Sequence, residues 1–114
     1  MTKDPEIFLR DILASIKLIE KRIKGVTYTQ FVNDVDLQDM VNRRLEIIGE
    51  AVRNLSKEFR DRHSDIGWQN PADMRSILIH GYFGVDLKVV WDTVAHDLPS
   101  FKEQVQKLLD DLEG

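Results

Sequence analysis

The stretch LQDMVNRRLEIIGEAVRNLSKEF, residues 37–59, decides the fold class of this 114-residue chain. Its apolar residues recur at intervals of three and four, which places them on one side of an α-helix. They are Leu37, Val41, Leu45, Ile48, Val52, Leu55 and Phe59. With Asp36 as the residue that caps its start, the pattern predicts one helix over residues 36–62, about 40 Å long. Such a helix would be the spine of a bundle.

A second amphipathic stretch precedes this spine. Residues 4–24 begin with Asp4 and Pro5, which favour a helix start, and Gly25 follows as a stop. The predicted apolar face consists of Phe8, Ile12, Ile16, Ile19 and Ile23. The opposite face carries Arg10, Lys17, Lys21 and Lys24. Such a basic face is most simply explained by exposure to solvent.

The C-terminal part predicts two further helices. One is capped by Asp86, with Leu87, Val90, Trp91 and Val94 on one side. The other starts at D-L-P, residues 97–99, and carries Phe101, Val105, Leu108 and Leu112. We therefore expect the apolar sides of both helices to face the spine.

Two connecting stretches lack a clear period. Residues 27–33 are predicted to be a loop, in which Thr29 can cap one short helical turn. Residues 63–71 are rich in turn formers and end at Pro71, which suits the start of another helix. We interpret Trp68 as an apolar plug over the bundle end rather than a base-stacking platform, and His63 as solvent-facing.

No alternating strand pattern occurs in the sequence, which predicts an all-α fold. We expect a single domain over residues 1–114, an antiparallel bundle of four main helices plus short ones. Because cysteine is absent, disulfides and thiolate chemistry are excluded, and a cytoplasmic location is expected. The N-terminal MTKDPEIF lacks a signal-peptide core, and no apolar run approaches the ~20 residues of a membrane span.

The formal net charge of −4 argues against a protein that coats nucleic acid through a basic face. It does not exclude a nuclease, because a few local arginines can hold one phosphate.

The stretch R-S-I-L-I-H-G-Y, residues 75–82, carries the chemistry, and it lies in a helix predicted over residues 71–81. Arg75 offers a permanent charge with forked donors, which suits phosphate oxygens. His80 can take or give a proton near neutral pH, and Tyr82 adds a hydroxyl. RNA brings its own nucleophile, the 2′-hydroxyl, so its cleavage requires no metal, and the sequence has no paired-histidine metal motif.

Helical geometry constrains how this motif could act. At about 100° per residue, Arg75 and His80 lie about 140° apart around one ideal helix. They could converge if the helix ends near Gly81, or if two copies meet across a two-fold axis. We favour the dimer.

Two residues of the spine have open interpretations. Gly49 lies inside the predicted helix, where glycine costs about 1 kcal/mol relative to alanine. Either another helix approaches it closely or the position simply tolerates glycine. Glu50 is either a surface acid or an acid that faces the region of His80.

Several segments together resemble the HepT-like branch of the HEPN superfamily. They are R-D-I-L at 10–13, N-R-R-L-E-I-I-G-E-A at 42–51, I-G-W at 66–68, M-R-S-I-L-I-H-G-Y-F-G-V-D-L-K-V-V-W at 74–91 and D-L-P at 97–99. The resemblance implies a helical homodimer whose R-x-x-x-x-H motifs meet in an interfacial cleft and cleave RNA without a metal or other cofactor. Such proteins commonly act as toxins.

The resemblance also implies a partner, the MNT-type nucleotidyltransferase antitoxin, which transfers AMP to the motif tyrosine. By position, Arg75 and His80 are the catalytic candidates, and Tyr82 is the candidate for AMPylation. Ser76 is a supporting candidate and departs from the family, which usually has asparagine, aspartate or histidine there.

Ser76 and the acidic net charge keep a second interpretation open. In it, the chain is a non-catalytic helical dimer that binds a nucleotide or docks the nucleotidyltransferase.

Overall fold

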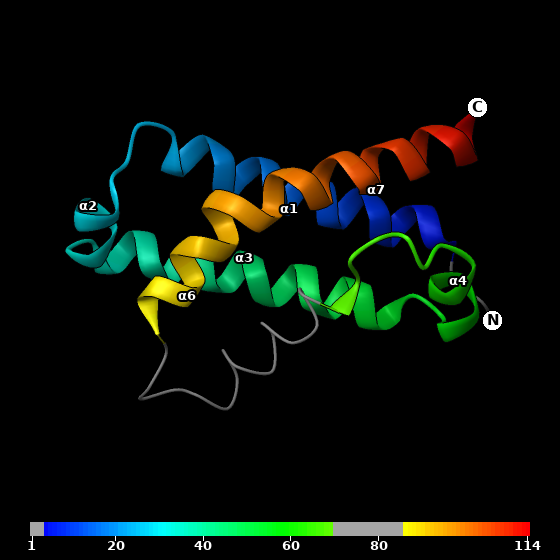
Figure 1. Ribbon diagram of the computed structural model, residues 1–114, viewed down its shortest axis with the longest axis horizontal. Helices are drawn as coiled ribbons and strands as arrows, with labels where there is room; N and C mark the ends of the chain where they lie inside the picture. Colours follow the sequence, from blue (N-terminus) through cyan, green and yellow to red (C-terminus); the bar gives the residue numbers. More distant parts are fainter. Residues whose placement is uncertain (1–3, 70–85) are drawn as a thin grey trace.

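The computed structural model describes residues 4–69 and 86–114. Helices account for the regular structure in these ranges, and no strand occurs in them, which confirms the predicted all-α class. The elements are α1 (Pro5–Ile23), α2 (Tyr28–Val32), α3 (Val35–Asn54), α4 (Lys57–Arg62), α6 (Leu87–Asp92), the π-helical η1 (Thr93–Asp97) and α7 (Leu98–Glu113). Figure 1 shows α1, α3 and α7 side by side, with α1 running opposite to the other two.

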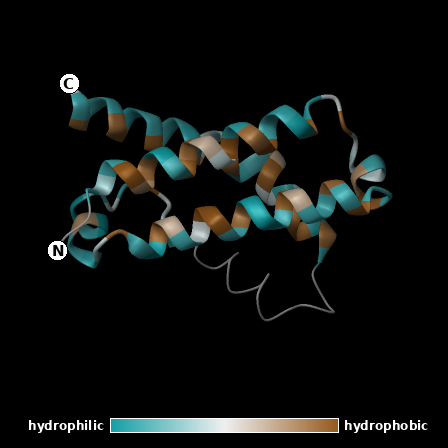
Figure 2. Cartoon of the chain, turned by 180° about the vertical axis from the view of Figure 1, so that it is seen from behind, coloured by the Kyte–Doolittle hydropathy of each residue, from teal (hydrophilic) through white to brown (hydrophobic). Residues whose placement is uncertain are grey.

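The core lies where α1 packs against α3 and α7. Hydrophobic and hydrophilic residues alternate along each of these helices (Figure 2), and the apolar stripes meet inside. The completely buried aliphatic residues are Leu9, Ile12, Ile16, Ile19, Val41, Ile48, Val52, Val90 and Val105. Because burying one such side chain stabilises the fold by about 1.5–3 kcal/mol, this packing is the main force that holds the bundle together.

The predicted ends of α1 are confirmed. The Asp4 carboxylate accepts a hydrogen bond from the Glu6 backbone N–H at 2.9 Å. At the other end Gly25 has φ of 75°, a conformation that favours glycine and stops the helix. The four basic residues predicted to face solvent, Arg10, Lys17, Lys21 and Lys24, are exposed.

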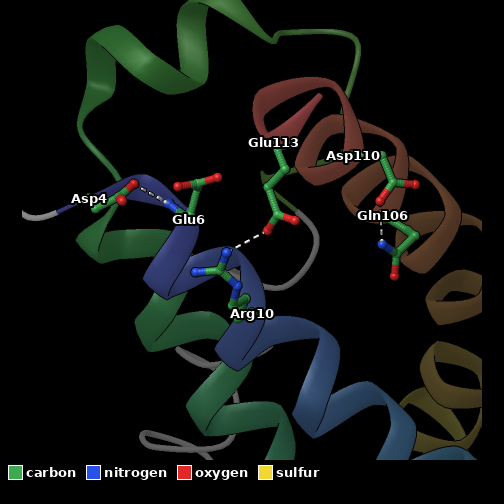
Figure 3. A network of polar contacts seen from close by, with 6 residues as sticks. All are labelled: Asp4, Glu6, Arg10, Gln106, Asp110 and Glu113. Carbon is green, nitrogen blue, oxygen red and sulfur yellow. Dashed lines mark hydrogen bonds and ion pairs between the residues drawn. The ribbon is translucent and has the colours of Figure 1, made fainter.

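The end of α7 is fastened to α1 by an ion pair between Arg10 and Glu113, shown in Figure 3. Partial burial and the neighbouring Asp4 carboxylate raise the pKa of Glu6 in the same network.

Leu112 was predicted to lie on the apolar side of α7, but its side chain is 44% exposed. The prediction is wrong because Leu108 and Leu109 complete the buried stripe before the last turn.

The prediction of a loop over residues 27–33 is wrong, because α2 forms there. Thr27 is its cap, and a reciprocal pair of hydrogen bonds with Gln30 forms a capping box. Thr29, the predicted cap, lies inside the helix. Phe31 is completely buried, so packing supports a helix too short to be stable alone.

The single helix predicted over residues 36–62 is two helices. Asp34 rather than Asp36 caps α3, since its carboxylate accepts from the Leu37 N–H at 3.0 Å. The chain then becomes extended at Leu55, and the Ser56 hydroxyl caps α4 through the Phe59 N–H at 3.0 Å. The turn lets both Leu55 and Phe59 enter the core, at 2% and 4% exposure.

The helix start predicted at residues 97–99 is confirmed, since α7 begins at Leu98 with Pro99 in its first turn, but no break separates it from α6 and η1. Asp97 has helical dihedral angles and makes no capping hydrogen bond. The Leu98 N–H instead donates to the Thr93 carbonyl five residues back, the bond that defines a π-helix. Pro99 has no backbone N–H and therefore cannot donate a hydrogen bond within the helix. The local widening of the helix lies directly before this proline.

Candidate functional site

The predicted site residues Arg75, Ser76, His80 and Tyr82 lie in residues 70–85, outside the described part of the chain. The helix predicted over residues 71–81 lies there too. The structure describes the two supports at which this motif segment joins the bundle: the turn ending at Gln69, and the helix that begins after Asp86.

Trp68 forms the centre of the first support. Its side chain is 6% exposed, and its indole N–H donates to the His63 carbonyl oxygen at 3.0 Å. Its ring meets Phe101 of α7 edge to face, with centroids 5.9 Å apart, and approaches Phe59 of α4 at 6.5 Å. The interpretation of Trp68 as an apolar plug is confirmed, and two helices hold the chain just before the motif segment.

His63 is less exposed than predicted. Its imidazole packs on the Phe59 ring at 4.7 Å between centroids, and the residue is partly buried. The same turn is tied to α7 at Gly67, whose N–H donates to the Gln104 side-chain oxygen at 3.3 Å. The first support is therefore fixed by aromatic packing and by two hydrogen bonds.

The second support starts at Asp86, which is confirmed as a helix cap. Its carboxylate accepts from the N–H groups of Lys88 at 2.9 Å and Val89 at 3.4 Å. One turn later Val90 is completely buried. Trp91 lies against the rings of Phe31 and Tyr28, at 5.3 and 6.2 Å between centroids. The chain after the motif segment is thus anchored on α2.

The spine residues with open interpretations both lie in α3. Gly49 is buried. Glu50 is exposed and lines a hollow of about 420 Å³ between α1 and α3, together with Asp11, Arg43 and Glu46. Whether Glu50 faces the region of His80 stays a prediction, since His80 lies outside the described residues.

One polar hollow was missed by the sequence reasoning. It measures about 210 Å³ and lies between α3, the Gly67 turn and the join of η1 with α7. His96, Asp97 and Ser100 lie on its rim. The feature of the sequence that could have indicated this hollow is the run H-D-L-P-S, residues 96–100, where a proline interrupts an otherwise helical apolar pattern.

Within residues 4–69 and 86–114, no group of three histidine, aspartate or glutamate side chains could hold a metal ion. No helix there combines the length and the apolar character that crossing a membrane requires.

A family model described as "Ribonuclease HepT-like" matches residues 12–108. Since this is most of the chain, the protein belongs to the HepT-like ribonuclease family, as its motifs predicted. The match includes the motif segment and both of its supports.

Curated relatives agree with this assignment. A protein of Thermococcus cleftensis named "Probable ribonuclease HepT" is 43% identical over 95% of this chain and 98% of its own length. One from Caldanaerobacter subterraneus named "Putative RNase" is also 43% identical, over 94% and 96%. A Methanocaldococcus jannaschii protein, "Gamma-glutamylcyclotransferase and putative RNase", is 48% identical over 99% of this chain, which spans only 51% of that relative. No solved structure matches the chain.

Proposed function

We propose that this protein is a metal-independent endoribonuclease in which Arg75 and His80 act directly on the phosphodiester. The observation that carries the proposal is the family match over residues 12–108, which contains an intact R-x-x-x-x-H-x-Y sequence at residues 75–82. The relatives named as ribonucleases support RNA as the substrate.

The chemistry needs a base, a charge stabiliser and a path for the leaving group. His80 accepts the proton of the 2′-hydroxyl as that oxygen attacks the neighbouring phosphorus. Arg75 stabilises the negative charge that grows on the non-bridging oxygens. The bond from phosphorus to the 5′-oxygen breaks, and that oxygen takes the proton that the protonated His80 returns. The products are a 2′,3′-cyclic phosphate and a 5′-hydroxyl, so no water molecule is consumed in this step.

The two supports explain how a short segment could hold its side chains for this reaction. Trp68 fixes the chain before the motif, and Asp86 with Trp91 fixes it afterwards. Catalytic groups lose efficiency when their positions are loose, so rigid attachment at both ends favours the reaction. Two such motifs in a homodimer would form one cleft, with the Ser76 hydroxyl as an additional hydrogen-bonding group.

We also propose that a partner protein inhibits the nuclease. An MNT-type nucleotidyltransferase would act as the antitoxin and transfer AMP from ATP to the Tyr82 hydroxyl, which loses its proton as pyrophosphate leaves. The added phosphate would lie two residues from His80, where it blocks the cleft and repels the RNA backbone. The Tyr82→Phe variant should cleave RNA but escape neutralisation by the partner. Continued protection of cells that express this variant would contradict the modification step.

The nuclease proposal is tested by RNA cleavage in EDTA with the wild type, Arg75→Ala and His80→Ala proteins. The wild type should remain active, while each variant should lose at least about a hundredfold in rate, the scale of one general base or one oxyanion donor. Equal activity in all three preparations would show a contaminating nuclease. Inactivity of the wild type on every RNA tested would favour the non-catalytic dimer.

A further inference from the structure

The hollow beside the π-helical join has the composition of a small-ligand site. Leu45 of α3 and Leu98 and Phe101 of α7 form an apolar lining, and each is at least 94% buried. Polar groups surround this lining at Thr93, His96, Asp97, Ser100, Gln104 and Gly67. An apolar interior with a few polar groups at the rim is typical of sites that bind small organic rings.

The size of the hollow restricts its ligand. Its volume of about 210 Å³ is smaller than the roughly 300–1,000 Å³ of sites that enclose drug-sized molecules. It is also much larger than the space of one water molecule, about 30 Å³. The volume therefore suits a ligand of about the size of one ring system.

The polar groups at the rim differ in whether they already make hydrogen bonds within the protein. The Thr93 hydroxyl donates to the Val89 carbonyl at 2.9 Å, and the Gln104 oxygen accepts from Gly67, so these two atoms are engaged. Asp97 makes no capping hydrogen bond, and Asp97, His96 and Ser100 are exposed. The continuation of the helix through η1 leaves the Asp97 carboxylate without the capping role that its sequence position suggests.

We propose that this hollow binds a guanine base of the RNA, an inference that rests on the proposed ribonuclease function. Guanine presents two adjacent donors, N1–H and the N2 amino group, which one carboxylate can accept together. Asp97 is the carboxylate on the rim, and His96 and Ser100 can donate to the guanine acceptors O6 and N7. The other three bases lack the paired donors.

The position of the hollow connects it to the reaction. Its wall includes Gly67 on the first support, directly before the motif segment. A second hollow of about 300 Å³ shares Gln104 and is lined by Lys107 and His63, but also by Asp65 and Asp111. Since the two carboxylates there outnumber the one lysine ammonium group, a phosphate gains little, and the base carries the recognition. Single-stranded RNA is commonly read through such splayed bases.

The test is an NMR titration of ¹⁵N-labelled protein with GMP, AMP, CMP and UMP, which needs no cleavage. GMP should shift the Gly67 and Ser100 amide signals and bind about tenfold or more tightly than the others, the discrimination of one paired contact. Asp97→Asn should lose the preference, and Ser100→Ala should weaken GMP binding. Asp110→Asn is the matched control, since Asp110 bonds to Gln106 on the same helix.

Equal shifts with all four nucleotides, or an unchanged GMP preference in Asp97→Asn, would overturn the guanine site. The Arg75→Ala protein should bind GMP like the wild type while it loses RNA cleavage. A wild type that prefers GMP but cleaves no RNA would refute the ribonuclease function, and with it the role of the hollow in RNA binding. An active enzyme without GMP preference would refute the hollow alone.

Discussion

The two supports of the motif segment differ in how they hold the chain. The first is mainly apolar, because the Trp68 side chain is buried between α4 and α7 and makes one hydrogen bond, through its indole N–H. The second begins with a polar cap, since the exposed Asp86 carboxylate binds two backbone N–H groups before Val90 and Trp91 enter the bundle. The difference implies that Trp68 contributes more to stability than the Asp86 cap, which mainly sets where α6 begins, while Val90 and Trp91 supply the packing of the second support.

Among the variants that test this difference between the supports, Trp68→Ala should lower the stability of the protein most. Removal of a buried tryptophan leaves a cavity between Phe59 and Phe101 and should lower the free energy of unfolding by about 3–5 kcal/mol. Chemical denaturation followed by circular dichroism measures the change. A loss below about 1 kcal/mol would mean that the first support is not a packing anchor.

Trp68→Phe separates packing from the indole hydrogen bond. The ring contacts are largely kept, but the His63 carbonyl oxygen loses the indole donor and keeps only the Ile66 N–H, so a smaller loss of about 1–2 kcal/mol is expected. The same denaturation measurement applies. If this variant is as unstable as Trp68→Ala, the size of the indole rather than aromatic packing decides the support.

Asp86→Ala should cost less than Trp68→Ala, about 1 kcal/mol, because it removes only the helix cap. Asp86→Asn is the matched control, since asparagine caps helices about as well as aspartate. The free energies of unfolding of both variants measure the effect. Equal losses in the two would show that the charge at Asp86, rather than the cap, stabilises α6.

Gln104→Ala should have the smallest effect. The variant leaves the exposed Gly67 N–H without its protein acceptor, and water can replace it, so about 0.5–1 kcal/mol is expected. Gln106→Ala on the same helix is the control, because its partner Asp110 is exposed and lies on the same helix. Hydrogen exchange at Gly67 should accelerate only in Gln104→Ala.

Much of the scaffold could be predicted from local chemistry. Asp4, Gly25 and Asp86 bound helices as their side chains or dihedral angles suggest, and Trp68 is buried. These features depend on a few neighbouring residues, so the sequence contains the necessary information.

The two interruptions of the long helical patterns could not be predicted in this way. The chain leaves α3 at Leu55 and Ser56 caps α4, although the apolar spacing continues past both residues. Asp97 followed by leucine and proline marks the start of α7 as predicted, but this local pattern does not reveal the π-helix that joins α7 to α6 without a break. Where these interruptions fall depends on which backbone conformation brings Leu55, Phe59, Leu98 and Phe101 into the core. This conformation is set by the positions of the other helices, which a local pattern does not contain.

The candidate sites show the same difference between local and long-range information. Arg75, His80 and Tyr82 could be predicted as site residues because their order is local and matches a family motif. The hollow at His96 and Asp97 was not found, because its walls come from α3, a turn and α7, which are distant in sequence.

The chemistry of the cleaved ends tests the central claim most directly. RNA is incubated with the wild type in EDTA, and the termini of the products are identified by mass spectrometry. Attack by the 2′-hydroxyl predicts 2′,3′-cyclic phosphates and 5′-hydroxyls, and these ends should be missing from reactions with His80→Ala. Products with 5′-phosphates and 3′-hydroxyls would show attack by water and contradict the proposed roles of Arg75 and His80.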